Sequence, residues 1–91
     1  MPEIPNARVT YQGHVQGVGF RYTVFELARG FDVSGYVLNL ADGRVLLEAE
    51  GEVSELRAFL AAVEEKMDGY IRSAERAEGV GPPRHQGFVI R

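Results

Sequence analysis

Hydrophobic and polar residues alternate along some segments of the chain and follow a helical period along others. Over residues 7–12 every second position is apolar or aromatic, which is typical of a half-buried strand. From Phe20 the period changes, and apolar residues recur at the spacing of one helical face. The residues on that face are Val24, Leu27, Ala28 and Phe31. The pattern therefore predicts a strand, a glycine-containing loop and an amphipathic helix.

The middle and the end of the chain repeat these signals. Residues 33–40 are rich in strand formers, and Ala41-Asp42-Gly43 predicts a hairpin turn before a partner strand over residues 44–50. After Gly51 a second helix is predicted, with Ser54 as a candidate N-cap and an apolar face that ends at Met67. Residues 70–78 alternate less regularly, residues 79–83 are predicted as a loop, and residues 88–90 as a short final strand.

The predicted order is strand, helix, strand, strand, helix, strand, with one further short strand. This order is that of the ferredoxin-like split βαβ arrangement among α+β folds, with an antiparallel sheet of four to five strands and two helices on one face. We expect residues 1–6 to form a flexible N-terminal arm that two prolines hold extended. Residues 7–91 are expected to form a single domain, because a chain of 91 residues has no room for a second core.

The composition excludes several classes of function. There is no cysteine, so disulfides and thiolate metal sites are absent, and the two histidines have no neighbouring ligand set, so no metal site is expected. The net charge of −3 predicts no general attraction to nucleic acid or to an anionic membrane. No apolar run has the length of a membrane span, and the first residues do not resemble a signal peptide. We therefore expect a cytoplasmic protein, with no obligate partner and hence a monomer.

Residues 13–21, Gly-His-Val-Gln-Gly-Val-Gly-Phe-Arg, form the strongest candidate site. Glycine permits left-handed backbone conformations and a close approach to main-chain N–H groups. The helix that follows adds unpaired N–H groups with a partial positive charge, and Arg21 adds a planar guanidinium that matches phosphate geometry. These features predict a phosphate site. The alternative is a plain glycine-rich connection with Arg21 solvated in the first helical turn.

Asn39 is the second candidate, because asparagine is a poor strand residue and this one lies near a strand end. Its carboxamide can donate to and accept from a single water molecule, which suits a residue that holds a nucleophilic water. Alternatively, it bonds the Asp42-Gly43 turn. His14 is interpreted as an exposed strand-end residue rather than a general base. The glutamates at positions 48, 50 and 52 are interpreted as one solvated strand face.

Together, residues 13–21, Gly-Tyr-Val-Leu-Asn at 35–39 and Asp-Gly-Arg-Val at 42–45 closely resemble the acylphosphatase family. The resemblance implies hydrolysis of the carboxyl-phosphate bond of small acylphosphates, without a metal, a cofactor or a covalent phosphoenzyme. It also implies that Arg21 binds the phosphoryl group and that Asn39 positions the attacking water. The backbone N–H groups implied to share phosphate binding with Arg21 are those of Gln16, Gly17, Val18, Gly19 and Phe20. Val24 and Asp32 depart from the family pattern, which has threonine and glycine there.

Two other functions remain open from the sequence. A catalytically silent acylphosphatase-like regulatory or binding domain would keep the fold and the phosphate site without turnover. An RNA-binding ferredoxin-like module shares the element order, and residues 17–22 faintly resemble its aromatic strand motif. That motif lacks a leading basic residue here and is predicted in a loop.

Overall fold

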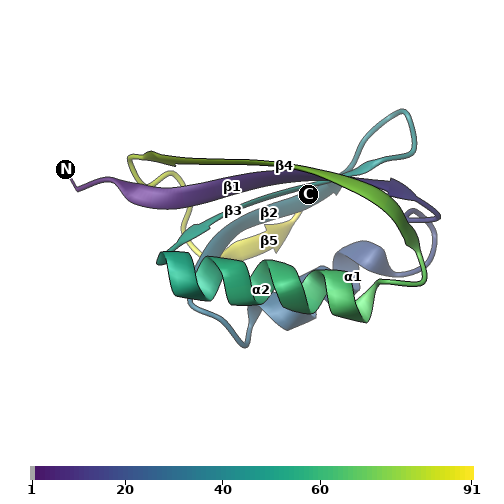
Figure 1. Cartoon of the computed structure of the whole chain (residues 1–91), viewed down its shortest axis with the longest axis horizontal. Coiled ribbons are helices and arrows are strands. Elements are labelled where there is room, and N and C mark those ends of the chain that lie inside the picture. Colours follow the sequence, from purple (N-terminus) through teal and green to yellow (C-terminus); the bar gives the residue numbers. More distant parts are fainter. Residues whose placement is uncertain (1) are drawn as a thin grey trace.

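The computed structural model describes residues 2–91 of the chain, and Met1 lies outside the described residues. The described chain forms five strands and two helices, shown in Figure 1. In chain order these are β1 (Ile4–Gly13), α1 (Phe20–Ala28), β2 (Val33–Asn39), β3 (Val45–Gly51), α2 (Val53–Lys66), β4 (Ile71–Gly81) and β5 (Phe88–Ile90).

The strands form one mixed sheet in the order β4-β1-β3-β2-β5. The pairs β1–β3, β1–β4 and β2–β3 are antiparallel, whereas β5 pairs with β2 in parallel. The prediction of a ferredoxin-like α+β fold is confirmed. The prediction of a wholly antiparallel sheet is wrong, because β5 is parallel to β2. Each helix connects two parallel strands that have a third strand between them, which is the split βαβ arrangement.

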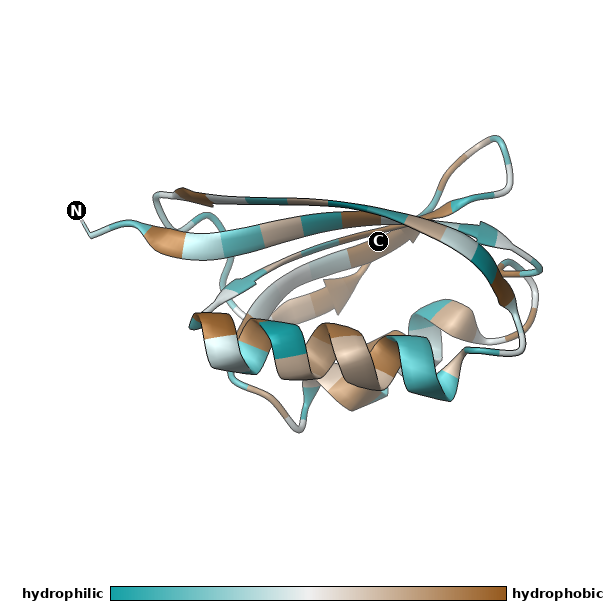
Figure 2. Ribbon diagram, viewed as in Figure 1, coloured by the Kyte–Doolittle hydropathy of each residue, from teal (hydrophilic) through white to brown (hydrophobic). Residues whose placement is uncertain are grey.

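Both helices lie on the same side of the sheet (Figure 1), and the core fills the space between the two layers. Hydrophilic and hydrophobic residues alternate along β1 in Figure 2, because successive side chains of a strand point to opposite faces. The fully buried side chains that α1, α2 and the central strands contribute include Val9, Tyr11, Val24, Val37, Leu47, Phe59, Leu60 and Val63. Because Val24 lies in this core, its departure from the family pattern is a packing difference.

Two predicted boundaries are wrong. β1 begins at Ile4, which pairs with Gly81 at the end of β4, so residues 4–6 belong to the sheet and not to a flexible arm. For the same reason residues 79–81, predicted as loop, extend β4. Pro5 is tolerated because β1 pairs with β3 only from Asn6 onward, so no ladder N–H is missing on that side.

The helix ends also differ in detail from the prediction. α2 is capped by Glu52 without a side-chain hydrogen bond, so Ser54 lies inside the first turn and is not the N-cap. Asp32, which replaces a family glycine, has no left-handed backbone, and its N–H donates to Glu55 Oε1 at 2.8 Å. Neither helix of the described chain is long and apolar enough to cross a membrane.

Candidate functional site

The glycine loop, residues 14–19, leaves the end of β1 and leads directly into α1. Gly17 and Gly19 have φ values of 79° and 77°, in the left-handed region. A Cβ atom added to either would meet nothing within 4 Å, so these positions need glycine for its conformation rather than for lack of space. Gly19 caps α1 in this conformation, which orients the loop at the helix N-terminus.

The main-chain N–H groups of residues 16–22, from the loop into α1, have no acceptor within residues 2–91. Among residues 2–91, the first hydrogen bond from this stretch into the helix is that of Thr23 N–H to Gly19 O, at 2.9 Å, and the N–H groups of residues 16–22 donate to no main-chain or side-chain oxygen. The first turn of α1 also carries no acidic side chain and no side-chain cap. Unpaired donors at a helix N-terminus attract an anion.

Arg21 is the second residue of α1, and its side chain is half-buried. Its Nη1 donates to the main-chain oxygen of Arg91, just after β5, at 3.0 Å. This bond holds the guanidinium between α1 and the end of β5, and no other hydrogen bond of this side chain occurs within the described chain. The Arg21 side chain is therefore not freely solvated, while most of its donors have no partner within residues 2–91.

Asn39 is the last residue of β2 and pairs with Val45 of β3. Its Oδ1 atom is buried and accepts no hydrogen bond from residues 2–91. The turn that it was alternatively expected to bond is closed by Asp42 instead, whose Oδ1 accepts from Arg44 N–H at 3.1 Å. A buried amide oxygen without a partner is costly, so this atom indicates a place for water or ligand.

A pocket of about 210 Å³ brings these groups together. The residues that line it are Val15, Gly17, Gly19, Phe20, Arg21, Tyr22, Asn39 and Ile90. Arg21 and Asn39, from α1 and from the end of β2, thus border the same cavity as both left-handed glycines. Of the residues predicted to bind phosphate through their N–H groups, Gln16 and Val18 do not line it, and Val18 packs against the core.

The Gln16 side chain has a role that the sequence did not indicate. Its Nε2 donates to Leu40 O at 2.8 Å and to Arg44 O at 2.9 Å, on the two sides of the β2–β3 turn. The side chain therefore fastens the glycine loop to the turn that follows Asn39. The sequence offers no signal for this contact, because a glutamine in a polar loop is usually solvated.

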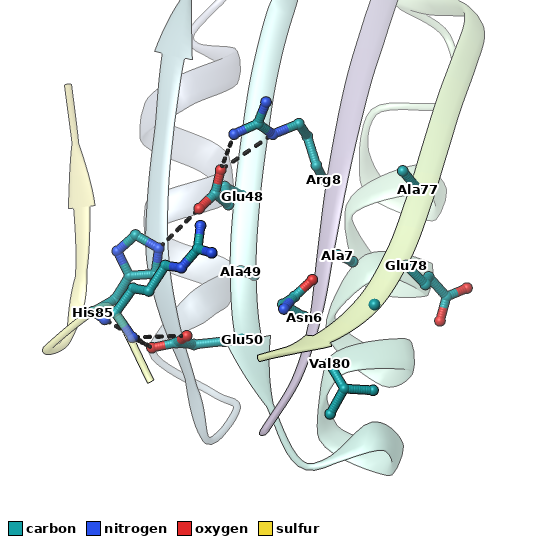
Figure 3. Close-up of a pocket in the computed structure, with 12 residues that line it drawn as sticks. Asn6, Ala7, Arg8, Glu48, Ala49, Glu50, Ala77, Glu78, Val80 and His85 are labelled. Carbon is teal, nitrogen blue, oxygen red and sulfur yellow. Dashed lines mark hydrogen bonds and ion pairs between the residues drawn. The ribbon is translucent and has the colours of Figure 1, made fainter. Parts of the chain in front are cut away.

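A second pocket, of about 360 Å³, lies on the sheet face opposite the helices (Figure 3). Here the glutamate cluster, defined as Glu48 and Glu50 with the groups that bond them, occupies the outer side of β3. Glu48 accepts from Arg8 Nη2 at 2.7 Å and Tyr36 Oη at 3.0 Å, and its Oε1 lies 3.1 Å from His85 Nε2. Burial by itself raises the pKa of Glu48, but these hydrogen bonds outweigh it and hold the pKa below the usual 4.5.

Glu50 is only 5% exposed, because the segment after β4 covers it. Its carboxylate accepts from the N–H groups of Arg84, at 2.9 and 3.1 Å, and of His85, at 2.8 Å. The prediction of a solvated glutamate face is therefore wrong for Glu48 and Glu50, although Glu52 is exposed. The sequence could not show that residues 84 and 85 fold back over β3.

His14 lies outside the pocket around Arg21 and Asn39, and the structure does not support the RNA-binding motif. His14 is exposed, donates its N–H to Tyr70 O at 2.9 Å and stacks its ring on that of Tyr70. Residues 17–19 are in the loop and residues 20–22 in α1, so the stretch that resembled an RNA-binding strand motif is not a strand. Within the described range, residues 2–91, no group of three or more His, Cys, Asp or Glu is placed to hold a metal ion.

Comparisons with known proteins agree on one family. The acylphosphatase family model matches residues 7–90. Acylphosphatase of Thermotoga petrophila is 36% identical over 84 residues, covering 92% of this chain and 93% of its own. Acylphosphatase of Corynebacterium glutamicum is 40% identical over 83 residues, covering 87% and 88%.

Solved structures give the same result. The crystal structure of acylphosphatase from Bacillus subtilis superposes with a TM-score of 0.86 at 34% identity, covering 96% of this chain and 98% of that one. A crystal structure of full-length HypF in a phosphate- and nucleotide-bound form matches at TM-score 0.82 and 30% identity, covering 100% of this chain but 12% of HypF. With the family match spanning the sheet, both helices and the pocket around Arg21 and Asn39, this chain belongs to the acylphosphatase family.

Proposed function

We propose that this protein hydrolyses the carboxyl-phosphate bond of small acylphosphates, releasing a carboxylate and inorganic phosphate. One observation carries the proposal: unpaired N–H donors, a guanidinium and an unpartnered buried amide oxygen border a single pocket of about 210 Å³. The first two match a phosphoryl group, and the third matches a water molecule beside it. The chain from Ile4 onward would act in this reaction as a single domain.

Phosphoryl binding is assigned to the N–H groups of residues 16–20 and to the Arg21 guanidinium. The absence of internal acceptors for the N–H groups in the described chain supports this assignment. The bond from Arg21 to Arg91 O orients the guanidinium before substrate arrives, so little ordering is needed on binding. Placed donors of this kind stabilise the charge on the equatorial oxygens in the transition state.

Water positioning is assigned to Asn39. In the reaction the water oxygen attacks phosphorus, the bond from phosphorus to the carboxylate oxygen breaks, and the carboxylate leaves with the electron pair. The water proton passes to the phosphate product or to solvent. Because an acylphosphate already carries a good leaving group, positioning and charge stabilisation supply most of what the reaction requires. Asn39 Oδ1 is buried beside the pocket and unpartnered, so it is available to accept from the attacking water.

The test is turnover of benzoyl phosphate by the wild-type chain and by Arg21→Ala. We expect wild-type hydrolysis with inorganic phosphate as a competitive inhibitor, and a loss of kcat/KM of at least about 10²-fold in the variant. Arg29→Ala, which removes an exposed arginine at the end of the same helix, is the matched control and should keep its activity. Near-normal turnover by Arg21→Ala would remove this residue from the mechanism.

The second candidate is a catalytically silent acylphosphatase-like domain. The match to a part of HypF, a protein of which this chain covers 12%, is the observation that favours it. In that case inorganic phosphate would still bind the wild-type chain in calorimetry, while benzoyl phosphate would decay no faster than in buffer. Action as a monomer in the cytoplasm also remains a prediction, and sedimentation equilibrium tests its first part.

A further inference from the structure

The pocket around Arg21 has a polar part and an apolar part. The polar part consists of the loop N–H groups, Arg21 and Asn39, which the proposed function assigns to the phosphoryl group and the water. The remaining lining residues are Val15, Phe20, Tyr22 and Ile90. Val15 and Phe20 are buried, whereas Tyr22 is 62% exposed and Ile90 is 40% exposed. Two large apolar side chains are thus accessible at the edge of a phosphate-sized polar site.

Tyr22 and Ile90 line the same pocket as Arg21, and each neighbours that residue or the residue that bonds it. Tyr22 is the next residue of α1, and Ile90 immediately precedes Arg91, whose main-chain oxygen accepts from Arg21 Nη1 at 3.0 Å. Ile90 is held by the parallel pairing of β5 with β2, where it is the partner of Val37. Because α1 and β5 are both fixed in the fold, Tyr22 and Ile90 stay beside the guanidinium in the absence of substrate.

Charged side chains are unevenly distributed around the pocket. Arg21 is the one charged residue among the eight that line it. If Arg21 is occupied by the phosphoryl group, a second negative charge on the substrate would have no cation in the pocket. An ion that loses water without gaining a partner binds weakly.

We propose that the acyl group of the substrate lies against Tyr22 and Ile90, so that the preferred substrates are acylphosphates with an uncharged, apolar acyl group. This inference rests on the proposed function and deepens it. A planar acyl group stacks on the Tyr22 ring, and an aliphatic one gains contact with Ile90. An acyl group with a free carboxylate is disfavoured, and a methyl group is too small to contact both side chains.

The test compares substrates within each variant, so that differences in intrinsic reactivity cancel. In Tyr22→Ala, kcat/KM for benzoyl phosphate should fall about three- to tenfold through KM, while that for acetyl phosphate stays unchanged. Ile90→Ala should give a smaller loss of about two- to threefold with the same selectivity. Tyr70→Ala and Val89→Ala remove exposed side chains that do not line the pocket and are the matched controls.

Charge is tested with butyryl phosphate and succinyl phosphate, which have similar length and differ by a terminal carboxylate. The wild type should prefer butyryl phosphate by at least about tenfold in kcat/KM. The inference is overturned if Tyr22→Ala slows benzoyl and acetyl phosphate equally, or if succinyl phosphate is hydrolysed as fast as butyryl phosphate.

Failure of the proposed function is a separate outcome. If the wild type hydrolyses none of these compounds, calorimetry with phenylphosphonate and methylphosphonate decides the inference by binding alone. A preference for the phenyl compound that Tyr22→Ala abolishes supports the apolar subsite without catalysis, and equal affinities overturn it. Urea unfolding midpoints of all variants show whether a loss reflects folding.

Discussion

Two pockets of this protein differ from each other in how their polar groups are satisfied. The larger, about 360 Å³, contains the glutamate cluster, and every carboxylate oxygen of Glu48 and Glu50 has a donor within the chain. The smaller, about 210 Å³, is bordered by N–H groups without acceptors and by the unpartnered Oδ1 of Asn39. The comparison teaches that unsatisfied polar groups, rather than pocket volume, distinguish a binding site from a structural cluster.

The same comparison separates stability from function. In the glutamate cluster, polar groups from β1, β2 and the segment after β4 bond Glu48 and Glu50 of β3 and so stabilise the folded chain. The dashed lines of Figure 3 mark the bonds from Arg8 and from the segment after β4. At the glycine loop, the N–H groups and the buried Asn39 oxygen have no partner within residues 2–91, which costs free energy. A bound phosphoryl group and water would offset it.

The largest effect is expected on activity at Asn39. Asn39→Ala should lower kcat by about 10²- to 10³-fold, since it removes a group aimed at the reacting water. Its free energy of unfolding should stay unchanged or rise, because the lost oxygen has no partner in the described chain. Asn6→Ala, which changes an asparagine that lines the larger pocket, is the control. Equal effects of the two substitutions on kcat would contradict the comparison.

The reverse result is expected at Glu50. Glu50→Ala leaves the N–H groups of Arg84 and His85 without their acceptor, and should lower the free energy of unfolding by about 2–3 kcal/mol in urea denaturation. Glu50→Gln keeps one acceptor oxygen and should lose less. Both variants should keep kcat for benzoyl phosphate while folded. A Glu50→Ala variant as stable as the wild type would show that solvent replaces these bonds without cost.

A smaller effect is expected from the backbone of the glycine loop. Gly19→Ala places a Cβ in open space but at a φ of 77°, so conformational strain of about 1–2 kcal/mol is its only penalty. In the free protein the loop can relieve this strain by leaving the conformation that presents its N–H groups. Inorganic phosphate should therefore bind about tenfold more weakly, measured as its inhibition constant. Gly69→Ala, also in open space but without a positive φ, should leave both phosphate binding and stability intact.

The smallest effect is a pH dependence of stability at Glu48. Hydrogen bonds from Arg8, His85 and Tyr36 hold its folded pKa below 4.5, against the effect of burial. The stabilisation is thus fully present above the unfolded pKa and is lost as the pH falls through the folded one. The loss should be about 1 kcal/mol or less, as for partly exposed ion pairs. Urea midpoints between pH 6 and pH 3 should fall less steeply in Glu48→Gln, and identical slopes would exclude this contribution.

Local sequence signals located most of the candidate site. The glycine loop before Arg21 and an asparagine near a strand end made both residues candidates, the resemblance to the acylphosphatase family linked them, and the fold brings them to one pocket. Their chemical roles stay predictions. By contrast, the residues around Gln16 in the sequence do not predict its bonds to Leu40 and Arg44, which lie 24 and 28 positions away. The periodicity of β3 placed Glu48 and Glu50 on one face correctly, but not their burial under a segment more than 30 residues away.

The order of strands and helices, the glycine loop and the absence of thiol chemistry were determined by the sequence alone, because they depend on residue types and short spacings. Tertiary structure decided which polar groups found partners. Arg21 is held by a main-chain oxygen 70 positions away, and Glu50 is covered by the chain returning after β4, whereas Asn39 Oδ1 has no partner within residues 2–91. Hydrogen bonds between distant segments exist only once the sheet brings those segments together, so no local pattern records them.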